Sequence, residues 1–402
     1  MRQVQSADRL GPALLLCWRR TSLALVALLL LLPALARGQE AWLVTYGPGE
    51  EVWEMFGHNA LWLRDPATGL DHTSSFGYFE IDRTGFHLDF ARGIMNYYGA
   101  SSPVEREFAF YRQRGRSISA QRLALEPAQV RELQQALHAA IYPHPQFYAY
   151  DYFRANCSTW LRDLINQVSD DRLRAVLQDT PARLNFRDHT RRMTVHRPWI
   201  HTGILLLMGP SIDRPISAWD EAFLPAALAR WIETVELDGV ALVSETQLLH
   251  DPQYFQPPYE ARSPWFLLLA VGLVAGGLIA ASARGRGAVA AVPWRFGALL
   301  AGLAGLVVLS MWAFSDHKDV AGNAILLLLH PLWVLLLPQF PEPWRRRMAA
   351  VLAGSALLGA LILAWPGVYQ DRSALLALLL PVLAGVLWAG VFSRTRRRSR
   401  AD

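Results

Sequence analysis

The last third of the chain consists of long apolar runs that charged residues interrupt only briefly. Five uncharged segments follow Arg262, each close to the ~20 residues that an α-helix needs to cross a bilayer. They are Ser263 to Ala283, Phe296 to Ser315, Val320 to Pro341, Met348 to Gln370 and Ser373 to Ser393. We therefore predict an all-α bundle of five transmembrane helices over residues 263–393.

The basic residues between these segments indicate their direction. Arginines are concentrated in the first and third connecting loops and in the tail, residues 394–402, whereas the second and fourth loops pair single cations with aspartates. Cytoplasmic loops of membrane proteins carry the excess of Lys and Arg. We therefore expect an Arg-rich cytoplasmic tail, with the segment before residue 263 on the outer side.

Near the N-terminus, Arg19 and Arg20 precede an uncharged, leucine-rich run from Thr21 to Ala36 that ends Ala-Leu-Ala. This is the pattern of a secretory signal peptide with a small-residue cleavage site. We predict that residues 1–36 are a signal peptide, with an uncleaved N-terminal anchor as the alternative. Both place residues 37–262 outside the cytoplasm.

The exported segment has the length of a single domain and shows patterns of both strands and helices. AWLVTYGPG, NALWLRDPATGL and the run from His72 to Phe76 are typical of short strands separated by Gly and Pro turns. Apolar residues recur at helical spacing after Pro127 and again after Asn156, which suits an N-cap. We expect an α+β domain in which Cys157 lies in the first turn of a helix.

Composition narrows the classes of function. Apolar residues make up 52% of the chain and charged residues 18%, which favours a membrane protein over one soluble globule. The net charge of +5 is explained largely by the arginines beside the apolar segments, so nucleic-acid binding is not expected. The sequence has no HExxH motif and no cluster of Cys and His, so neither a metal site nor a cofactor is expected.

Of the two cysteines, Cys17 precedes the apolar part of the predicted signal peptide. After cleavage, Cys157 would be the only thiol, in an oxidising compartment where it has no partner for an internal disulfide. A buried core cysteine is the simple alternative. At a helix start, however, the helix dipole and a nearby imidazole can lower the pKa of a thiol from ~8.5, and backbone N–H groups can hold an oxyanion. Cys157 is therefore a candidate nucleophile.

A thiol nucleophile needs a base, and eleven histidines are available. His58 lies in Gly57-His58-Asn59 at the start of an expected strand, but catalytic pairs are adjacent in space and not in sequence. The competing histidines are His72, His87, His138, His144, His189, His196 and His201. Spacing alone leaves the choice of base open.

The motifs FGHNALWL and FRANCSTWLRD resemble the Lnb N-terminal periplasmic domain family. The similarity continues through GRSISAQRLAL, the stretch from Arg197 to Pro225 and the apolar tail. The resemblance implies that Cys157 is the nucleophile and His58 the general base. It also implies a permuted papain-like fold, in which the cysteine opens a helix packed on an antiparallel sheet that bears the histidine.

In such folds a polar residue on the strand after the histidine strand orients the imidazole. Asp71, His72 and Ser75 are available, and we select Asp71, although an aspartate there also suits a simple turn residue. Asn156 is a candidate helix cap and neighbour of the oxyanion.

Three further residues are candidate ligands of an anionic headgroup. Arg116 and Gln121 match a family motif, and Arg162 follows the nucleophile on its helix. In the third apolar segment, Asn323 and His330 are polar groups that hydrocarbon penalises. They are either functional residues or hydrogen-bonding partners in helix packing.

The resemblance also implies an activity, because members of the family resemble lipoprotein N-acyltransferases. The protein would lie in the bacterial inner membrane and move an acyl chain from a phospholipid donor through a Cys157 thioester to the α-amine of a diacylated lipoprotein. One alternative is a periplasmic cysteine peptidase or amidase acting on peptidoglycan or protein. Another is a non-catalytic envelope factor that binds lipid.

Overall fold

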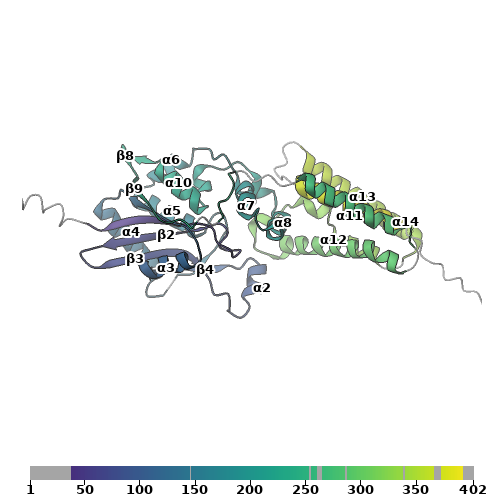
Figure 1. Cartoon of the computed structure of the whole chain (residues 1–402), viewed down its shortest axis with the longest axis horizontal. Coiled ribbons are helices and arrows are strands. Elements are labelled where there is room, and N and C mark those ends of the chain that lie inside the picture. The colour runs from purple at the N-terminus through teal and green to yellow at the C-terminus, as the bar shows by residue number, and fades with distance from the viewer. Residues whose placement is uncertain are drawn as a thin grey trace, which may run out of the picture.

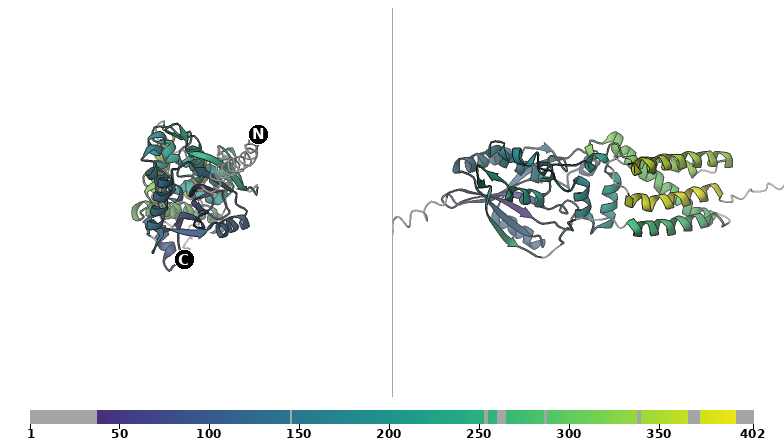
Figure 2. Two further views of the ribbon diagram at one scale, coloured as in Figure 1. Left: turned by 90° about the vertical axis from the view of Figure 1, so that its left-hand side faces the viewer. Right: turned by 90° about the horizontal axis from the view of Figure 1, so that it is seen from above.

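The computed structural model describes residues 38–144, 146–252, 255–259, 265–285, 288–337, 340–365 and 373–392. The molecule has an α+β domain at one end and long helices at the other, with a layer of short helices between them (Figures 1 and 2). The predicted signal peptide, residues 1–36, and the predicted tail, residues 394–402, lie outside the described residues.

A seven-stranded antiparallel sheet forms the centre of the α+β domain, with the strand order β6-β4-β3-β2-β1-β5-β9. Its strands are β1 (Glu40–Tyr46), β2 (His58–Asp65), β3 (Leu70–Tyr78), β4 (Asn96–Pro103), β5 (Ile118–Leu123), β6 (Tyr148–Ala149) and β9 (Val243–His250). A separate hairpin consists of β7 (Glu236–Leu237) and β8 (Val240–Ala241). The first three strands lie where the sequence predicts them.

Helices cover both faces of the sheet, because its central strands carry apolar residues on both sides. On one face, Leu43 and Leu61 belong to a core shared with α4 (Pro127–Ile141), α5 (Cys157–Val168) and α10 (Pro225–Glu233). On the other face, Val44 packs in a core with α3 (Val104–Gln113). The two predicted helices are α4 and α5, and α5 lies on β2 and β3. This packing brings the start of α5 to the end of the sheet where β2 begins.

The shorter helices lie at the edges of the sheet and between it and the long helices (Figure 1). They are α2 (Phe86–Ala91), α6 (Arg172–Leu177), α7 (Phe186–Thr194), α8 (Pro198–Leu207), the 3-10 helix η1 (Pro210–Asp213) and α9 (Ala218–Glu221).

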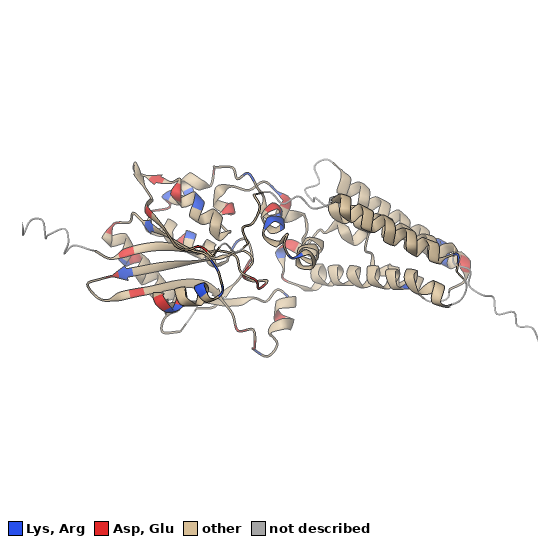
Figure 3. Ribbon diagram, in the orientation of Figure 1, with Lys and Arg blue, Asp and Glu red and all other residues tan. Residues whose placement is uncertain are grey.

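Four of the described helices are long and apolar enough to cross a membrane. They are α11 (Trp265–Ser282), α12 (Ala288–Phe314), α13 (Glu342–Ala364) and α14 (Ser373–Phe392). They correspond to the first, second, fourth and fifth predicted segments. Their central parts carry no charge, and the charged residues of the bundle lie at its ends (Figure 3).

In the third predicted span, residues 320–341, the described residues 320–337 do not form an α-helix, so the prediction of a fifth transmembrane α-helix was wrong. The chain forms three 3-10 helices there: η2 (Lys318–Val320), η3 (Ala324–Leu327) and η4 (Pro331–Leu336). Gly322 has a left-handed backbone with φ of +68°, and Pro331 has no N–H to donate. Both residues interrupt a continuous hydrogen-bond ladder.

The polar residues of this segment satisfy backbone groups that the interruptions set free. The Asn323 side chain accepts a hydrogen bond from the Ile325 N–H (3.2 Å) and donates to the carbonyl of Leu206 in α8 (2.8 Å). The His330 ring accepts a hydrogen bond from the Leu332 N–H (3.2 Å). Asn323 therefore has a partner on a packed helix, whereas the bond of His330 is a local cap of η4.

The segment nevertheless passes through the bundle. Leu329 packs against Gly305 of α12, and Val334 packs against Gly302, which lies further from the outer end of that helix. Leu327 packs against Gly359 in the half of α13 that is farther from Glu342. Because a 3-10 helix rises about 2.0 Å per residue, against 1.5 Å in an α-helix, the segment needs few residues for the crossing.

The loop after α12 joins the bundle to the α+β domain. Arg154, in the loop before α5, donates two hydrogen bonds to Asp319, of 2.8 and 2.9 Å. The same carboxylate accepts a hydrogen bond from Ser211 (2.6 Å), and the Asp316 N–H donates to the Arg92 carbonyl (2.7 Å). These contacts place the start of α5 at the end of the α+β domain that faces the bundle.

Candidate active site

Helix α5 begins at Cys157 because Asn156 caps it. The Asn156 side-chain oxygen accepts hydrogen bonds from the N–H groups of Ser158 (2.9 Å) and Thr159 (3.0 Å). Its amide group donates to the Phe223 carbonyl (2.9 Å), so the cap is also held from outside the helix. Cys157 therefore has a defined position, in which it is 8% exposed.

The sulfur of Cys157 faces the beginning of β2 and the end of β3. The backbone N–H of Asn59 and the Ser158 hydroxyl (3.8 Å) lie close to it and favour its ionised form. The Ser158 hydroxyl also donates to the Asn59 side chain (2.8 Å), which fixes α5 to β2. At Gly77 a Cβ atom would lie 3.8 Å from that of Cys157, and φ is +100°, so glycine suits this contact.

Burial nevertheless raises the pKa of the Cys157 thiol. The helix start supplies the expected N–H donors, but the loss of solvent penalises the thiolate more than they stabilise it. The helix start alone therefore does not bring the pKa of this thiol below its usual value.

His58 is the first residue of β2 and pairs with Tyr46 of β1. Its half-buried imidazole lies among three tyrosine rings, with centroids 6.2 Å from Tyr46, 6.4 Å from Tyr111 and 6.5 Å from Tyr78. In the described part of the chain the ring has no hydrogen-bond partner, Cys157 included. Burial, followed by the positive charge of a nearby arginine, lowers the pKa of His58 to about 3.

At neutral pH the resting pair is thus a thiol and a neutral imidazole, not a thiolate and an imidazolium. A neutral imidazole can accept a proton, as a general base must. In such a pair, proton transfer accompanies the attack of the sulfur on a substrate and does not precede it.

Arg116 supplies the positive charge that acts on His58, and its guanidinium is also close enough to feel a Cys157 thiolate. The side chain is 3% exposed; Nε donates to the Gly47 carbonyl (2.8 Å) and Nη1 lies 3.5 Å from a Glu54 carboxylate oxygen. Among the described residues, Nη2 has no hydrogen-bond partner although it is buried. A buried cation with an unpaired donor can bind an anionic group at this position.

A buried polar network lies behind the histidine. The Tyr46 hydroxyl donates to Glu107 (2.8 Å), and the Thr73 hydroxyl donates to the same carboxylate (2.5 Å). Burial raises the pKa of Glu107. No sequence pattern predicts this network, because its members come from two strands and a helix that meet only in the fold.

The structure does not bring Asp71 to His58. Asp71 lies at the far end of the β2–β3 pairing, where its carboxylate accepts a hydrogen bond from the Trp62 indole N–H (2.6 Å). The β3 residue that packs against His58 is Tyr78, whose hydroxyl accepts a hydrogen bond from Ser75 (3.1 Å).

Two of the three candidate headgroup ligands lie away from the thiol. Arg162 is buried, donates to the Trp219 carbonyl (2.8 Å) and lies over that indole ring at 3.9 Å. Gln121 is buried and donates to the Ala229 carbonyl in α10 (3.0 Å). Only Arg116 is close to the nucleophile and the histidine.

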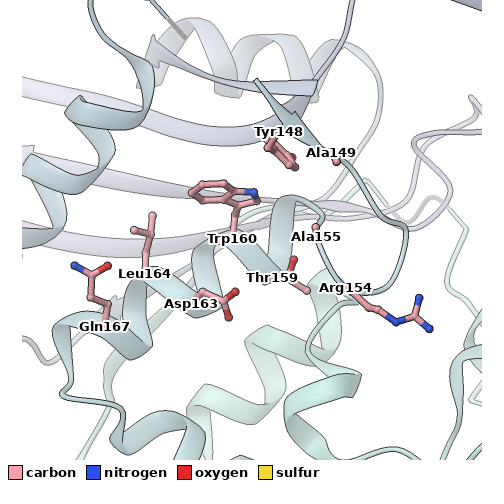
Figure 4. A pocket seen from close by; sticks show the side chains of 9 residues that line it. All are labelled: Tyr148, Ala149, Arg154, Ala155, Thr159, Trp160, Asp163, Leu164 and Gln167. Atoms are coloured by element: carbon pink, nitrogen blue, oxygen red, sulfur yellow. The ribbon is translucent and has the colours of Figure 1, made fainter. Parts of the chain in front are cut away.

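A groove of about 350 Å³ lies between α5 and β6 (Figure 4). Tyr148 and Trp160 line its middle, with Arg154 towards one end and Gln167 towards the other. Cys157 is not a lining residue, so the groove is a neighbour of the candidate site and not the site itself.

Comparison with known families covers both parts of the chain. Residues 37–193 match the Lnb N-terminal periplasmic domain, and residues 263–394 match the Lnb transmembrane domain. No curated protein and no solved structure matches the chain.

Proposed function

Because the chain belongs to the Lnb family and has both its periplasmic and its transmembrane domain, we propose that the protein is a lipoprotein N-acyltransferase of the bacterial inner membrane. The chain is a membrane protein with several spans and a periplasmic N-terminal domain. The proposed reaction moves an acyl chain from a phospholipid to the N-terminal α-amine of a diacylated lipoprotein.

The observation that carries the proposal is the position of Cys157 and His58. A cysteine at a helix start lies beside the first residues of an antiparallel strand that bears an unprotonated histidine. This arrangement supports a permuted papain-like thiol enzyme that forms a covalent thioester intermediate.

In the first half-reaction, the Cys157 sulfur attacks the carbonyl carbon of a phospholipid ester while His58 takes the thiol proton. A C–S bond forms, the C–O bond to the glycerol breaks, and the lysophospholipid alkoxide leaves with the proton from His58. In the second half-reaction, the neutral α-amine attacks the thioester carbonyl. A C–N bond forms, the C–S bond breaks, and the amine proton returns through His58 to the thiolate.

Negative charge develops on the carbonyl oxygen in both half-reactions. The backbone N–H of Asn59 lies at the sulfur, and the buried Nη2 of Arg116, which has no partner among the described residues, is a further donor near the site. Preorganised donors of this kind are worth about 10²–10³ in rate each when they reach the oxyanion. We assign Arg116 either to this oxygen or to the donor phosphate, because both are anionic oxygen ligands.

The position of the site relative to the bundle also supports acyl transfer. The loop that leads into Cys157 is hydrogen-bonded to Asp319 at the outer end of the spans. Donor and acceptor are both anchored by acyl chains in the same leaflet, so a site held at its surface meets both at high effective concentration. A peptidase with water-soluble substrates gains nothing from this position.

The function is tested in a bacterial host depleted of its own lipoprotein N-acyltransferase. Mass spectrometry of a lipoprotein N-terminus should show a third acyl chain when the wild-type chain is present. Cys157→Ala and His58→Ala should each abolish that chain while the protein still inserts in the membrane. His138→Ala, which removes an exposed histidine of α4, is the matched control and should retain activity.

Two outcomes would contradict the proposal. Unchanged triacylation with Cys157→Ala would exclude the thioester mechanism. A lipoprotein or wall peptide that is cleaved, with no added acyl chain, would instead favour the peptidase or amidase reading.

A further inference from the structure

Exposed apolar side chains gather on the loops that lie between the candidate site and the bundle. Helix α2 has no buried residue, and its Leu88 is 64% and its Phe90 41% exposed. Val52 and Trp53, just before β2, are exposed as well. An exposed apolar patch on a folded domain marks a binding surface, because contact between apolar side chains and water is unfavourable.

Helix α2 is attached to the outer end of the bundle. The ring of His317 hydrogen-bonds to the Phe90 carbonyl (2.8 Å), directly after the end of α12. A Cβ atom on Gly93 would lie 2.7 Å from the His317 nitrogen, so the two backbones are in close contact. Figure 1 shows α2 beside this end of α12.

Aromatic residues mark the same level as a membrane surface. Trp312 and Phe314 are exposed at the outer end of α12, Trp265 at the start of α11, and Trp365 at the end of α13. Tryptophan is enriched where a span meets the headgroups. Helix α2 therefore lies at the headgroup level of the outer leaflet.

A row of aromatic contacts connects α2 with the nucleophile. Ring centroids are 5.4 Å apart for Phe86 and Phe79, 4.9 Å for Phe79 and Tyr97, and 4.5 Å for Tyr97 and Tyr150. Tyr150 lies 3.6 Å from the Cβ position at Gly77, the glycine that contacts Cys157. These contacts, which include the buried ring of Tyr97, join α2 to the residues around Cys157.

We propose that α2 and this aromatic row bind an acyl chain of an outer-leaflet phospholipid and lead its ester to Cys157. The inference rests on the proposed acyltransferase function and specifies where that enzyme binds its donor. A lipid is the occupant that fits, because the exposed side chains are apolar and lie beside lipid-facing aromatics. Asp89, the one carboxylate within α2, is paired with Arg83 (2.6 Å), so the helix itself presents no unpaired acidic group.

Photo-crosslinking tests the contact without relying on activity. Benzoylphenylalanine is placed at position 88, or at position 240 in β8, which is 59% exposed at the opposite end of the domain. The full chain is reconstituted in vesicles of phosphatidylethanolamine and phosphatidylglycerol. We expect at least about tenfold more phospholipid adduct at position 88 than at position 240. Equal yields at the two positions would overturn the inference.

Two acyl donors separate this inference from the proposed function. Acyl-Cys157 is measured with vesicle phospholipid and with a water-soluble aryl butyrate, for Leu88→Asp and for the control Val240→Asp. We expect Leu88→Asp to lower acylation by phospholipid at least about tenfold and acylation by the butyrate less than about twofold. Val240→Asp should resemble the wild type with both donors.

The outcomes are distinct. Wild-type rates of Leu88→Asp with phospholipid, or an equal loss with both donors, would overturn the lipid-binding role of α2. A wild-type protein that forms no acyl-Cys157 from phospholipid would instead contradict the proposed function.

Discussion

The thiol of Cys157 and the imidazole of His58 are both driven toward their neutral forms by burial. Two local features position them: the Asn156 cap fixes the start of α5, and β2 begins at His58. The pair differs in this respect from a thiolate–imidazolium pair, in which the nucleophile is already ionised. A thiol held in its neutral form reacts slowly with oxidants and alkylating agents.

This difference predicts how Cys157 reacts with iodoacetamide. Alkylation of the wild-type protein should be slow at pH 7 and rise about tenfold per pH unit through pH 9, because only the thiolate reacts. His58→Gln should leave this profile unchanged, because the neutral imidazole carries no charge that stabilises the thiolate. Peptide mass spectrometry follows Cys157 alone. A rate plateau between pH 5 and 7 that disappears in His58→Gln would contradict the neutral pair.

A second prediction concerns the guanidinium of Arg116. Arg116→Gln should lower the rate of Cys157 acylation by about 10²-fold, because the buried donor near the site is lost. Arg116→Lys keeps the positive charge but lacks the planar guanidinium, so its rate should lie between those of Arg116→Gln and the wild type. Arg114→Gln, which alters the more exposed partner of Glu54, is the control and should change the rate less than about twofold. Equal rates for Arg116→Gln and the wild type would exclude a role of Arg116 in the acylation of Cys157.

The sequence predicted part of this site. Cys157 follows from a cap residue and helical spacing, both local signals, whereas His58 required the family resemblance because strand pairing decides which histidine meets the thiol. Asp71 was misplaced for a geometric reason. In the β2–β3 hairpin, Asp65 pairs with Leu70 next to the turn, and the pairing continues residue by residue away from the turn. Asp71 therefore lies close to the turn, whereas His58, at the other end of β2, lies opposite the region of Gly77.

At the scale of elements, the loop before α5 is positioned by the membrane bundle. Arg154 binds Asp319 through two hydrogen bonds, and Ser211 binds the same carboxylate. These bonds lower the pKa of Asp319, so the carboxylate stays ionised and the pair persists at acidic pH. Cys157 follows Arg154 by three residues in the chain. The Arg154–Asp319 pair therefore sets the distance of the nucleophile from the membrane surface.

Breaking this pair should impair acyl transfer without removing a catalytic group. Asp319→Ala is expected to lower the rate with vesicle phospholipid about tenfold, because small displacements of a nucleophile cost large factors in rate. Asp316→Ala, in which the interdomain backbone hydrogen bond is retained, is the matched control. The exchanged variant Arg154→Asp with Asp319→Arg should recover part of the activity. A wild-type rate for Asp319→Ala would show that the pair has no positioning role.

The third predicted span shows what hydropathy does not reveal. Length and apolarity predicted that residues 320–341 cross the membrane, but they carry no information on the backbone hydrogen-bond ladder. A proline alone does not predict a break in a membrane helix, since Pro293 and Pro381 lie inside the α-helices α12 and α14. Gly322 and Pro331 break the helix, and Asn323 and His330 cap the pieces that result. Hydropathy registers only the polarity of these residues.

At the scale of the whole molecule, this crossing decides the orientation of the arginines at the start of α13. Because residues 320–337 pass through the bundle and pack against α12 and α13, Arg345, Arg346 and Arg347 lie on the cytoplasmic side, in agreement with the positive-inside rule. A segment that returned to the outer face would place these arginines in the periplasm.

Cysteine labelling tests this orientation. In a chain without its native cysteines, Lys318→Cys should react with a membrane-impermeant maleimide added to intact spheroplasts. Glu342→Cys should react only after the membrane is permeabilised. Labelling of both positions from outside would contradict the crossing.

The molecule as a whole places a thiol site at the end of a domain that rests on its own membrane bundle (Figure 1). Acyl donor and acceptor would reach Cys157 from the same leaflet, and the protein would carry the acyl chain between them. The proposed reaction therefore depends on a thioester at Cys157.

The most direct test incubates the purified full-length protein in vesicles with a phospholipid that carries an isotope-labelled acyl chain. We predict a labelled acyl group on the Cys157 peptide, which a diacylated lipopeptide with a free α-amine then removes to yield labelled triacyl lipopeptide. Release of the label only as free fatty acid, or triacyl lipopeptide formed equally well by Cys157→Ala, would contradict the account.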